Sequence, residues 1–152
     1  MPTVSRRLRT AHARDGVYGS EPPKFGSIEL LPEWNAVCHD HCNVLVEAPA
    51  AVAEEVISAL RPHLRYPILE YSSKSGVPLQ PPAEGTVILW EVASLAPDQQ
   101  AQLLRWIDEG AARLNVQLAS TSSEPLYPLV EAGAFDATLY YRLNTIRLEW
   151  FD

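Results

Sequence analysis

Short apolar runs alternate with segments of helical periodicity from residue 43 to the end of the chain. The runs predict five strands, which span residues 43–46, 66–71, 86–90, 116–120 and 145–150. Between them, apolar side chains at helical spacing predict helices over residues 50–60, 97–112, 126–132 and 139–143. Because strands separated by helices pair in parallel, we expect an α/β fold with helices on both faces of a parallel five-stranded sheet.

Length and charge divide the chain into two parts. It has 152 residues, of which 47% are hydrophobic and 20% charged, a composition typical of one folded domain. The net charge is −7, yet residues 1–24 hold five basic and two acidic side chains. We therefore expect a flexible basic arm over residues 1–24 and an acidic domain over residues 25–152. The acidic domain disfavours nucleic acid as a partner, while the arginines of the arm leave a contact with DNA or an acidic partner open.

Cysteine use and hydropathy indicate a cytoplasmic protein. Two cysteines are too few for a disulfide framework. No apolar run approaches the roughly 18–20 residues that a membrane span needs. The first residues contain arginines but lack the apolar core of a secretory signal. We therefore expect a location in the cytoplasm and no membrane contact.

Three segments carry a resemblance to a known family. Residues 85–95 read GTVILWEVASL, residues 100–105 read QAQLLR, and residues 139–144 read LYYRLN. In this order and spacing they resemble the GTLFLDEIGEL, QAKLLR and LYYRLN segments of the ATPase domain of sigma-54-dependent transcriptional activators. These bacterial enhancer-binding proteins are a branch of the AAA+ ATPases. The resemblance covers most of residues 43–148 and implies a P-loop-type AAA+ fold.

The phosphate-binding loop of that family is altered in this chain. The family reads GESGTGKE after its first strand, whereas residues 48–55 read APAAVAEE. The glycine positions are occupied by Ala48, Ala51 and Ala53, and the lysine position is occupied by Glu54. Each alanine adds a Cβ where the loop needs positive φ or close backbone approach, and Glu54 repels phosphate. We expect an ordinary strand-to-helix turn and no nucleotide cofactor.

The other positions of the nucleotide site are altered as well. Trp90 stands where the family has the Walker B aspartate, and Glu91 retains the glutamate that follows it. An indole cannot bind Mg²⁺, so Glu91 is expected to be a solvated or hydrogen-bonded carboxylate rather than a catalytic group. Ser122 replaces the polar sensor asparagine, and Asp136 replaces one trans-acting arginine. Arg142 of the YYRLN segment is retained, with a structural or an interface role.

The resemblance also implies missing parts. The family carries an insertion with a GAFTGA loop that contacts sigma-54, and here the corresponding interval is the short stretch of residues 72–84. The chain ends shortly after the last predicted strand. We expect a truncated and degenerate member without the helical lid or a helix-turn-helix domain. Neither remodelling of the sigma-54 polymerase nor promoter recognition is then expected.

A second cluster of reactive side chains lies outside the resemblance. Residues 38–42 read Cys38, His39, Asp40, His41 and Cys42, and each of these residue types can bind zinc. Five consecutive residues cannot easily close a tetrahedron around one ion, because structural zinc ligands usually come from separated turns. A reduced cysteine pair with exposed histidines is favoured, and a metal shared between two chains is the alternative.

These observations favour a regulatory module without enzymatic activity. A retained AAA+ scaffold with altered chemistry predicts a pseudo-ATPase that binds a protein, for example an active AAA+ activator or a signalling protein. Tyr140, Tyr141 and Arg142 form its candidate interface, and a monomer or dimer is expected rather than a hexamer. Two alternatives remain: residual nucleotide or metal binding with weak ATPase activity, and a nucleic-acid accessory that uses the arm.

Overall fold

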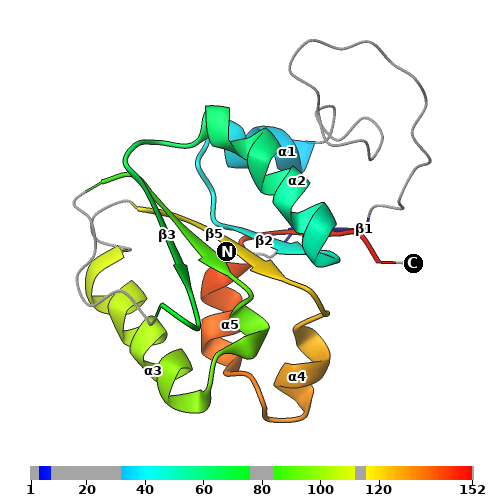
Figure 1. The fold of residues 1–152 in the computed structure, drawn as a ribbon, viewed down its shortest axis with the longest axis vertical. Helices are drawn as coiled ribbons and strands as arrows, with labels where there is room; N and C mark the ends of the chain where they lie inside the picture. The colour runs from blue at the N-terminus through cyan, green and yellow to red at the C-terminus, as the bar shows by residue number, and fades with distance from the viewer. Residues whose placement is uncertain (1–3, 8–31, 76–83, 112–115, 152) are drawn as a thin grey trace.

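A single parallel sheet organises the chain (Figure 1). The computed structural model describes residues 4–7, 32–75, 84–111 and 116–151. Six parallel strands lie in the order β1 (Val4–Arg7), β6 (Ile146–Glu149), β2 (Val44–Glu47), β5 (Gln117–Ser122), β4 (Thr86–Trp90) and β3 (Ile68–Ser72). All five strands expected from the pattern are present, and the parallel α/β architecture is confirmed.

The sixth strand corrects the expected strand count and part of the expected arm. Val4–Arg7 pairs in parallel with β6, with Val4 opposite Ile146 and Arg7 opposite Glu149. These four residues were expected to belong to a flexible segment, but their backbone extends the sheet by one strand. The remainder of the arm, residues 8–24, lies outside the described residues.

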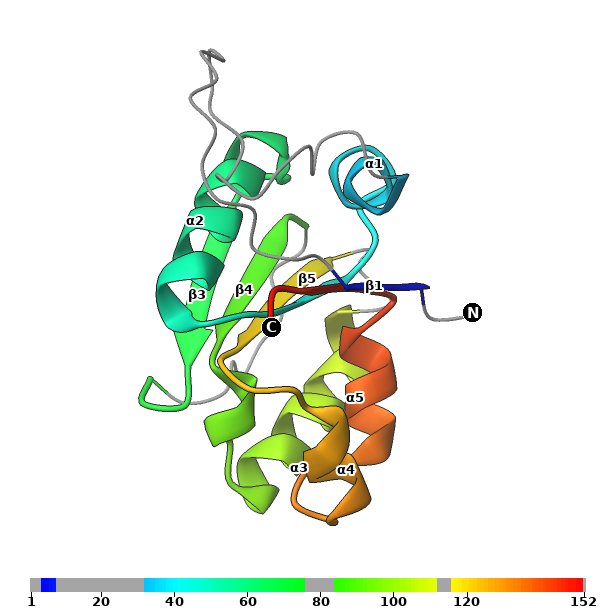
Figure 2. The ribbon, with the colours of Figure 1, turned by 90° about the vertical axis from the view of Figure 1, so that its right-hand side faces the viewer.

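Helices cover both faces of the sheet, as expected (Figure 2). Two of them, α1 (Pro32–Cys38) and α2 (Ala50–Leu60), lie on one face. The opposite face carries α3 (Pro97–Trp106), its π-helical continuation η4 (Ile107–Ala111), α4 (Tyr127–Glu131) and α5 (Ala137–Leu143). Two short 3₁₀ turns, η2 (Arg61–His63) and η3 (Val92–Ser94), complete the described elements. Among the helices that the structure describes, none is long and apolar enough to cross a membrane.

Two apolar cores follow from the alternation of side chains along the central strand. In β2, Val44 and Val46 pack toward α1 and α2, whereas Leu45 packs toward α3 and α5. Every residue of this strand is buried, as is typical of a central parallel strand with helices on both faces. The carboxyl end of β2 is thereby held in the middle of the sheet, where the candidate site begins.

The connection from β2 to α2 is short. Helix α2 begins at Ala50, three residues after β2 ends at Glu47. It buries Val56, Ile57 and Leu60 against the sheet and is followed by η2, which contains a proline. The observed bounds match the predicted helix over residues 50–60, because the apolar spacing and Pro62 are both local signals.

Candidate functional site

Most positions that the motif resemblance assigns to a nucleotide site gather at one edge of the sheet. Strands β2, β4 and β5 are adjacent and parallel, so their carboxyl ends lie at the same edge. Residues 48–54, 90–91 and 122 follow or end these strands. In open parallel sheets this edge is where ligands bind. The fold therefore brings together most of the positions that the sequence singled out.

The backbone of residues 48–53, between β2 and the first turn of α2, is hydrogen-bonded within the fold. Ala48 is fully buried, and its N–H donates to the carbonyl of Ser122 at 2.9 Å. Pro49 has no N–H group and takes φ −51° and ψ 148°. The N–H of Ala53 donates to the carbonyl of Pro49 at 2.9 Å, so regular helix begins at once. The residues form a tight strand-to-helix turn in place of an open loop.

The side chains of this turn point in two directions. Ala53 is 2% exposed and packs in the core beneath α2, whereas Ala51 and Glu54 are exposed on that helix. No side chain caps the N-terminus of α2, which leaves helix-terminal N–H groups that favour anions. Glu54, in the second turn, places a negative charge on this end of the helix and opposes such binding.

Trp90 is held by a hydrogen-bonded network on the face of α2. Its Nε1–H donates to Oε1 of Glu70 on β3 at 2.9 Å. The same oxygen accepts from the Arg61 guanidinium at 2.7 Å. The Arg61 and Trp90 hydrogen bonds lower the pKa of the Glu70 carboxyl below its ordinary value. The indole also packs against the core on this face, so Trp90 is a fixed apolar ring at the end of β4.

Glu91 has a strained backbone and a satisfied side chain. Its φ of 52° places it in the left-handed region, which non-glycine residues occupy infrequently. The N–H donates to Oγ1 of Thr121 at 3.0 Å, and the carbonyl accepts from the Ser94 hydroxyl at 2.7 Å. Its carboxylate accepts from the Ser123 hydroxyl at 2.8 Å. The Glu91 carboxylate is thus hydrogen-bonded, and its lack of a catalytic role stays a prediction.

The sensor and arginine positions have local structural roles. Ser122 is fully buried, and its hydroxyl donates to the carbonyl of Glu124 in the turn after β5. Asp136 caps α5: its Oδ1 accepts from the N–H of Leu139 at 2.8 Å. The N–H of Asp136 donates to Oε1 of Gln100 at 2.8 Å, which ties the start of α5 to α3. An aspartate is among the preferred residues for such a cap.

The YYRLN segment divides between core and surface. Tyr140 is 6% exposed, whereas Tyr141 is 56% exposed on the same helix. Nε of Arg142 lies 2.9 Å from Oδ1 of Asp108 in η4, and both side chains are about half exposed. The carbonyl of Arg142 also accepts from the side chain of Asn43, just before β2. Arg142 therefore has a structural contact, and its interface role stays a prediction.

The cysteine and histidine cluster is spread over a turn. Cys38 ends α1 in the core, while His39 is exposed. His41 has a φ of 53° and faces the amide of Gln117. Burial raises the pKa of the Cys38 thiol to about 11, and burial together with the charge of Asp40 raises that of Cys42. Within the described ranges, no three His, Cys, Asp or Glu side chains converge as metal ligands.

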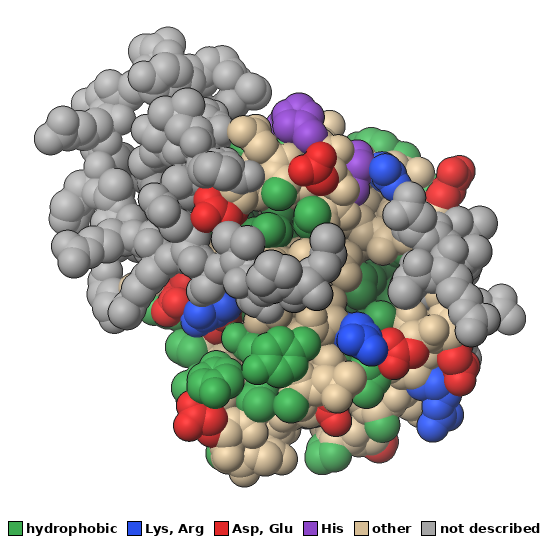
Figure 3. Space-filling view, turned by 180° about the vertical axis from the view of Figure 1, so that it is seen from behind, with side chains coloured by type: hydrophobic (Ala, Val, Ile, Leu, Met, Phe, Trp, Pro, Cys, Tyr) green, Lys and Arg blue, Asp and Glu red, His purple; other side chains and the backbone are tan. Residues whose placement is uncertain are grey.

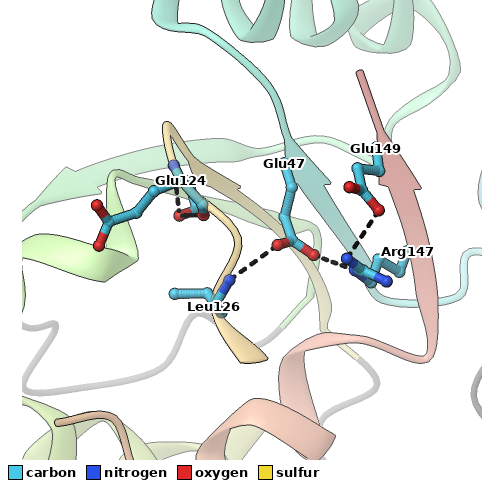
Figure 4. Close-up of polar contacts among 6 residues, drawn as sticks. Glu47, Glu124, Leu126, Arg147 and Glu149 are labelled. Carbon is cyan, nitrogen blue, oxygen red and sulfur yellow. Dashed lines mark hydrogen bonds and ion pairs between the residues drawn. The ribbon is translucent and has the colours of Figure 1, made fainter. Parts of the chain in front are cut away.

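A buried ionic cluster, which no sequence motif indicated, lies at the carboxyl edge of the sheet (Figure 4). Glu47 has no exposed surface, and its carboxylate accepts from the N–H of Leu126 at 2.8 Å and from Nε of Arg147. The Arg147 guanidinium also contacts Glu149 at 2.8 Å. Burial by itself lowers the pKa of the Arg147 guanidinium, but the hydrogen bond with Glu47 and the charges of Glu47 and Glu149 outweigh it, so this pKa lies above its ordinary value. A charged residue at the end of an apolar strand was the available signal.

A parallel sheet with helices on both faces defines a doubly wound α/β domain. The chain belongs to the Sigma-54 interaction domain family, whose sequence model matches residues 42–150. The resemblance inferred from the motifs is thereby confirmed.

Curated relatives are transcriptional regulators. The phenol regulator MopR of Acinetobacter guillouiae is 41% identical over 69 residues, which make up 40% of this chain and 12% of MopR. The regulatory protein TyrR of Enterobacter agglomerans is 33% identical over 42% of this chain and 14% of TyrR. A Nif-specific regulatory protein of Rhizobium leguminosarum bv. trifolii is 35% identical over 41% of this chain and 20% of its own length. The matches thus span a fifth or less of each regulator.

Solved structures agree on the fold. NtrX from Brucella abortus, in a complex with ATP, superposes with a TM-score of 0.61 at 17% identity. The match covers 77% of this chain and 33% of that NtrX chain. A structure of NtrX with ADP gives a TM-score of 0.59, also at 17% identity, over 76% of this chain and 33% of that one. The chain is thus a Sigma-54 interaction domain related to transcriptional regulators.

Proposed function

We propose that this Sigma-54 interaction domain regulates transcription by binding a protein partner and does not hydrolyse ATP. The observation that carries the proposal is the closed connection between β2 and α2. A phosphate loop wraps backbone N–H groups around the nucleotide and adds a lysine. Here the N–H groups of Ala48 and Ala53 are bonded within the fold, and Pro49 has none.

Electrostatics at this edge support the same proposal. Two like charges about 4 Å apart repel by about 1 kcal/mol in water and by more in a cleft. Glu54 is exposed on α2 and brings this repulsion to the position at which the related ATPases carry a lysine. A lysine there would have attracted the phosphates.

The metal position offers further support. Hydrolysis needs a carboxylate for Mg²⁺ and a base or orienting group for water. Trp90 supplies an indole that is hydrogen-bonded to Glu70, and the Glu91 carboxylate is engaged by Ser123. The remaining carboxylate therefore has no neighbouring metal ligand of the Walker B type.

The proposed partner is a protein in the same regulatory system. The chain keeps the sheet, the helices on both faces and the LYYRLN helix α5, which are the surfaces by which related domains could be recognised. An active AAA+ activator or another signalling protein in the cytoplasm fits this scaffold. Because ring closure by nucleotide contacts is not expected, we propose a monomer or dimer.

Thermal unfolding with and without Mg-ATP tests the absence of nucleotide binding. A ligand at 100 times its Kd adds about 2.7 kcal/mol to stability, which raises Tm by several degrees in a domain of this size. We expect no change in Tm at millimolar Mg-ATP. A reproducible rise of several degrees contradicts the proposal.

Measurement of phosphate release, with Glu91→Ala as the matched variant, tests the absence of hydrolysis. We expect no release above background from either protein. Release that disappears in the variant assigns a catalytic role to Glu91 and contradicts the proposal. Release that is equal in both comes from a contaminating ATPase.

A further inference from the structure

Three tyrosines form a contiguous aromatic patch on α4 and α5, which we call the tyrosine surface: Tyr127, Tyr140 and Tyr141. The ring centroids of Tyr127 and Tyr140 are 6.0 Å apart, and those of Tyr140 and Tyr141 are 5.3 Å apart. Tyr127 is 47% exposed and Tyr141 is 56% exposed. In Figure 3, hydrophobic side chains gather over the part of the molecule where these helices lie. The patch is therefore apolar, and two of its three rings reach solvent.

The tyrosine surface is rigid as well as exposed. Tyr140 is 6% exposed, and its ring contacts each of the other two rings. The start of α5 is fixed by the Asp136 cap and by the hydrogen bond from Asp136 to Gln100. Tyrosines on a fixed support offer a large contact area at low entropic cost, and they are enriched at protein interfaces.

The elements around the tyrosine surface are acidic. In the described part of the chain, α3, η4, α4, α5 and the turn before α4 expose six carboxylates and two arginines, one of which, Arg142, pairs with Asp108. The six carboxylates are Asp98, Asp108, Glu109, Glu124, Glu131 and Asp136. Glu131 follows Tyr127 by four residues on α4, a spacing that places both on one side of the helix.

Among the described residues of these elements, the exposed carboxylates outnumber the arginines, and a surface with an excess of negative charge attracts cations.

We propose that the tyrosine surface binds a lysine- or arginine-rich segment of a protein partner. Cationic groups are attracted to the faces of aromatic rings, and the surrounding carboxylates complement their charge. The same carboxylates repel nucleic acid. The inference rests on the proposed function only in that the partner is a protein, and it is independent of the absence of ATP hydrolysis.

Fluorescence anisotropy with a labelled peptide of alternating arginine and serine residues tests the proposal on the full chain. The comparison peptide alternates glutamate and serine. The informative variant is Tyr127→Ala with Tyr141→Ala, and Tyr127→Phe with Tyr141→Phe keeps the rings. Tyr66→Ala is the matched control. Tyr66 is 71% exposed and directly precedes β3, the edge strand farthest from β6 and β1 in the sheet.

We expect saturable binding of the arginine peptide that weakens about tenfold in the double alanine variant. Binding stays within about twofold of the unchanged chain in the phenylalanine and Tyr66→Ala variants, and the glutamate peptide does not bind. Circular dichroism shows that each variant is folded.

Three results overturn the proposal. The first is an absence of saturable binding, and the second is equal weakening by Tyr66→Ala, which indicates diffuse attraction to an acidic protein. The third is self-association that is lost in the double alanine variant without peptide binding, because the occupant is then a second copy of the chain. None of these results affects the Mg-ATP measurement, so the two proposals fail separately.

Discussion

Replacing Arg147 with methionine leaves the buried Glu47 carboxylate without its cation. Glu47 has no exposed surface, and the Arg147 side chain is 18% exposed. Removal of one partner of a buried ion pair costs about 3–5 kcal/mol, because the remaining charge stays desolvated. With a urea m-value of about 2 kcal/mol/M, the unfolding midpoint falls by about 2 M. Equilibrium urea unfolding, followed by circular dichroism, measures this shift.

Two further variants separate the unpaired charge from the loss of packing. Glu47→Gln combined with Arg147→Met removes both charges and keeps an oxygen for the N–H of Leu126. We expect this double variant to be more stable than Arg147→Met alone, since no uncompensated carboxylate remains at position 47. Arg142→Met is the surface control: its pair with Asp108 is 49% and 44% exposed, and such pairs contribute about 0.2–1 kcal/mol.

Two outcomes contradict the proposed cost of leaving the Glu47 charge unpaired. If Arg147→Met costs no more than Arg142→Met, the burial of Glu47 does not determine the cost. If the double variant is as unstable as Arg147→Met, the loss comes from packing and not from an unpaired charge. Because folded domains have only about 5–15 kcal/mol of stability, an unfolded single variant and a folded double variant also support the argument.

Three more predictions follow from the site. Trp90→Phe removes a hydrogen bond that lowers the pKa of Glu70. Because the Glu70 side chain is 42% exposed, solvent screening limits the loss at neutral pH to about 0.5 kcal/mol. A carboxyl whose pKa is lower in the folded than in the unfolded chain stabilises the fold at pH values above its unfolded pKa. The difference in stability between the variant and the unchanged chain therefore shrinks as pH falls below 4.5. Urea unfolding at several pH values measures this difference, and a difference independent of pH contradicts the prediction. Asp136→Ala removes the cap of α5 and costs about 1 kcal/mol, whereas Asp136→Asn retains most of the stability. Since burial raises the pKa of Cys38 to about 11, iodoacetamide labels it slowly at pH 8 in the folded chain and rapidly in urea, as peptide mapping shows; equal rates contradict a buried thiol.

Local periodicity could predict a helix or strand only where the apolar spacing within that element is itself sufficient. Helix α2 was predicted with its observed bounds because its apolar spacing and Pro62 are adjacent in the chain. The seven residues of α1 were missed, since Trp34, Val37 and Cys38 are buried by contacts with the distant sheet and are too few for a periodic signal. Likewise, β1 was missed because its pairing with β6 depends on tertiary structure.

The same distinction applies to the candidate site. The altered positions 48–54 and 90–91 could be recognised one motif at a time. The Glu47 and Arg147 pair could not, because these residues are 100 positions apart and meet only when β2 and β6 are neighbours. The structural role of Asp136 was also missed, since an aspartate that departs from a family motif resembles a loss until its contact with Leu139 is seen.

The position of β6 between β1 and β2 has a consequence for synthesis on the ribosome. β1 pairs with β6, the last of the described strands, and Val4 lies opposite Ile146. Synthesis proceeds from the N-terminus, so β1 emerges early and has no hydrogen-bonding partner in the sheet until the final strand is translated. β1 therefore cannot pair until β6 has been synthesised. Contacts between residues so far apart in the sequence slow folding. A ribosome stalled before residue 146 would present β2 with an open edge, at which a chaperone or another nascent chain could bind.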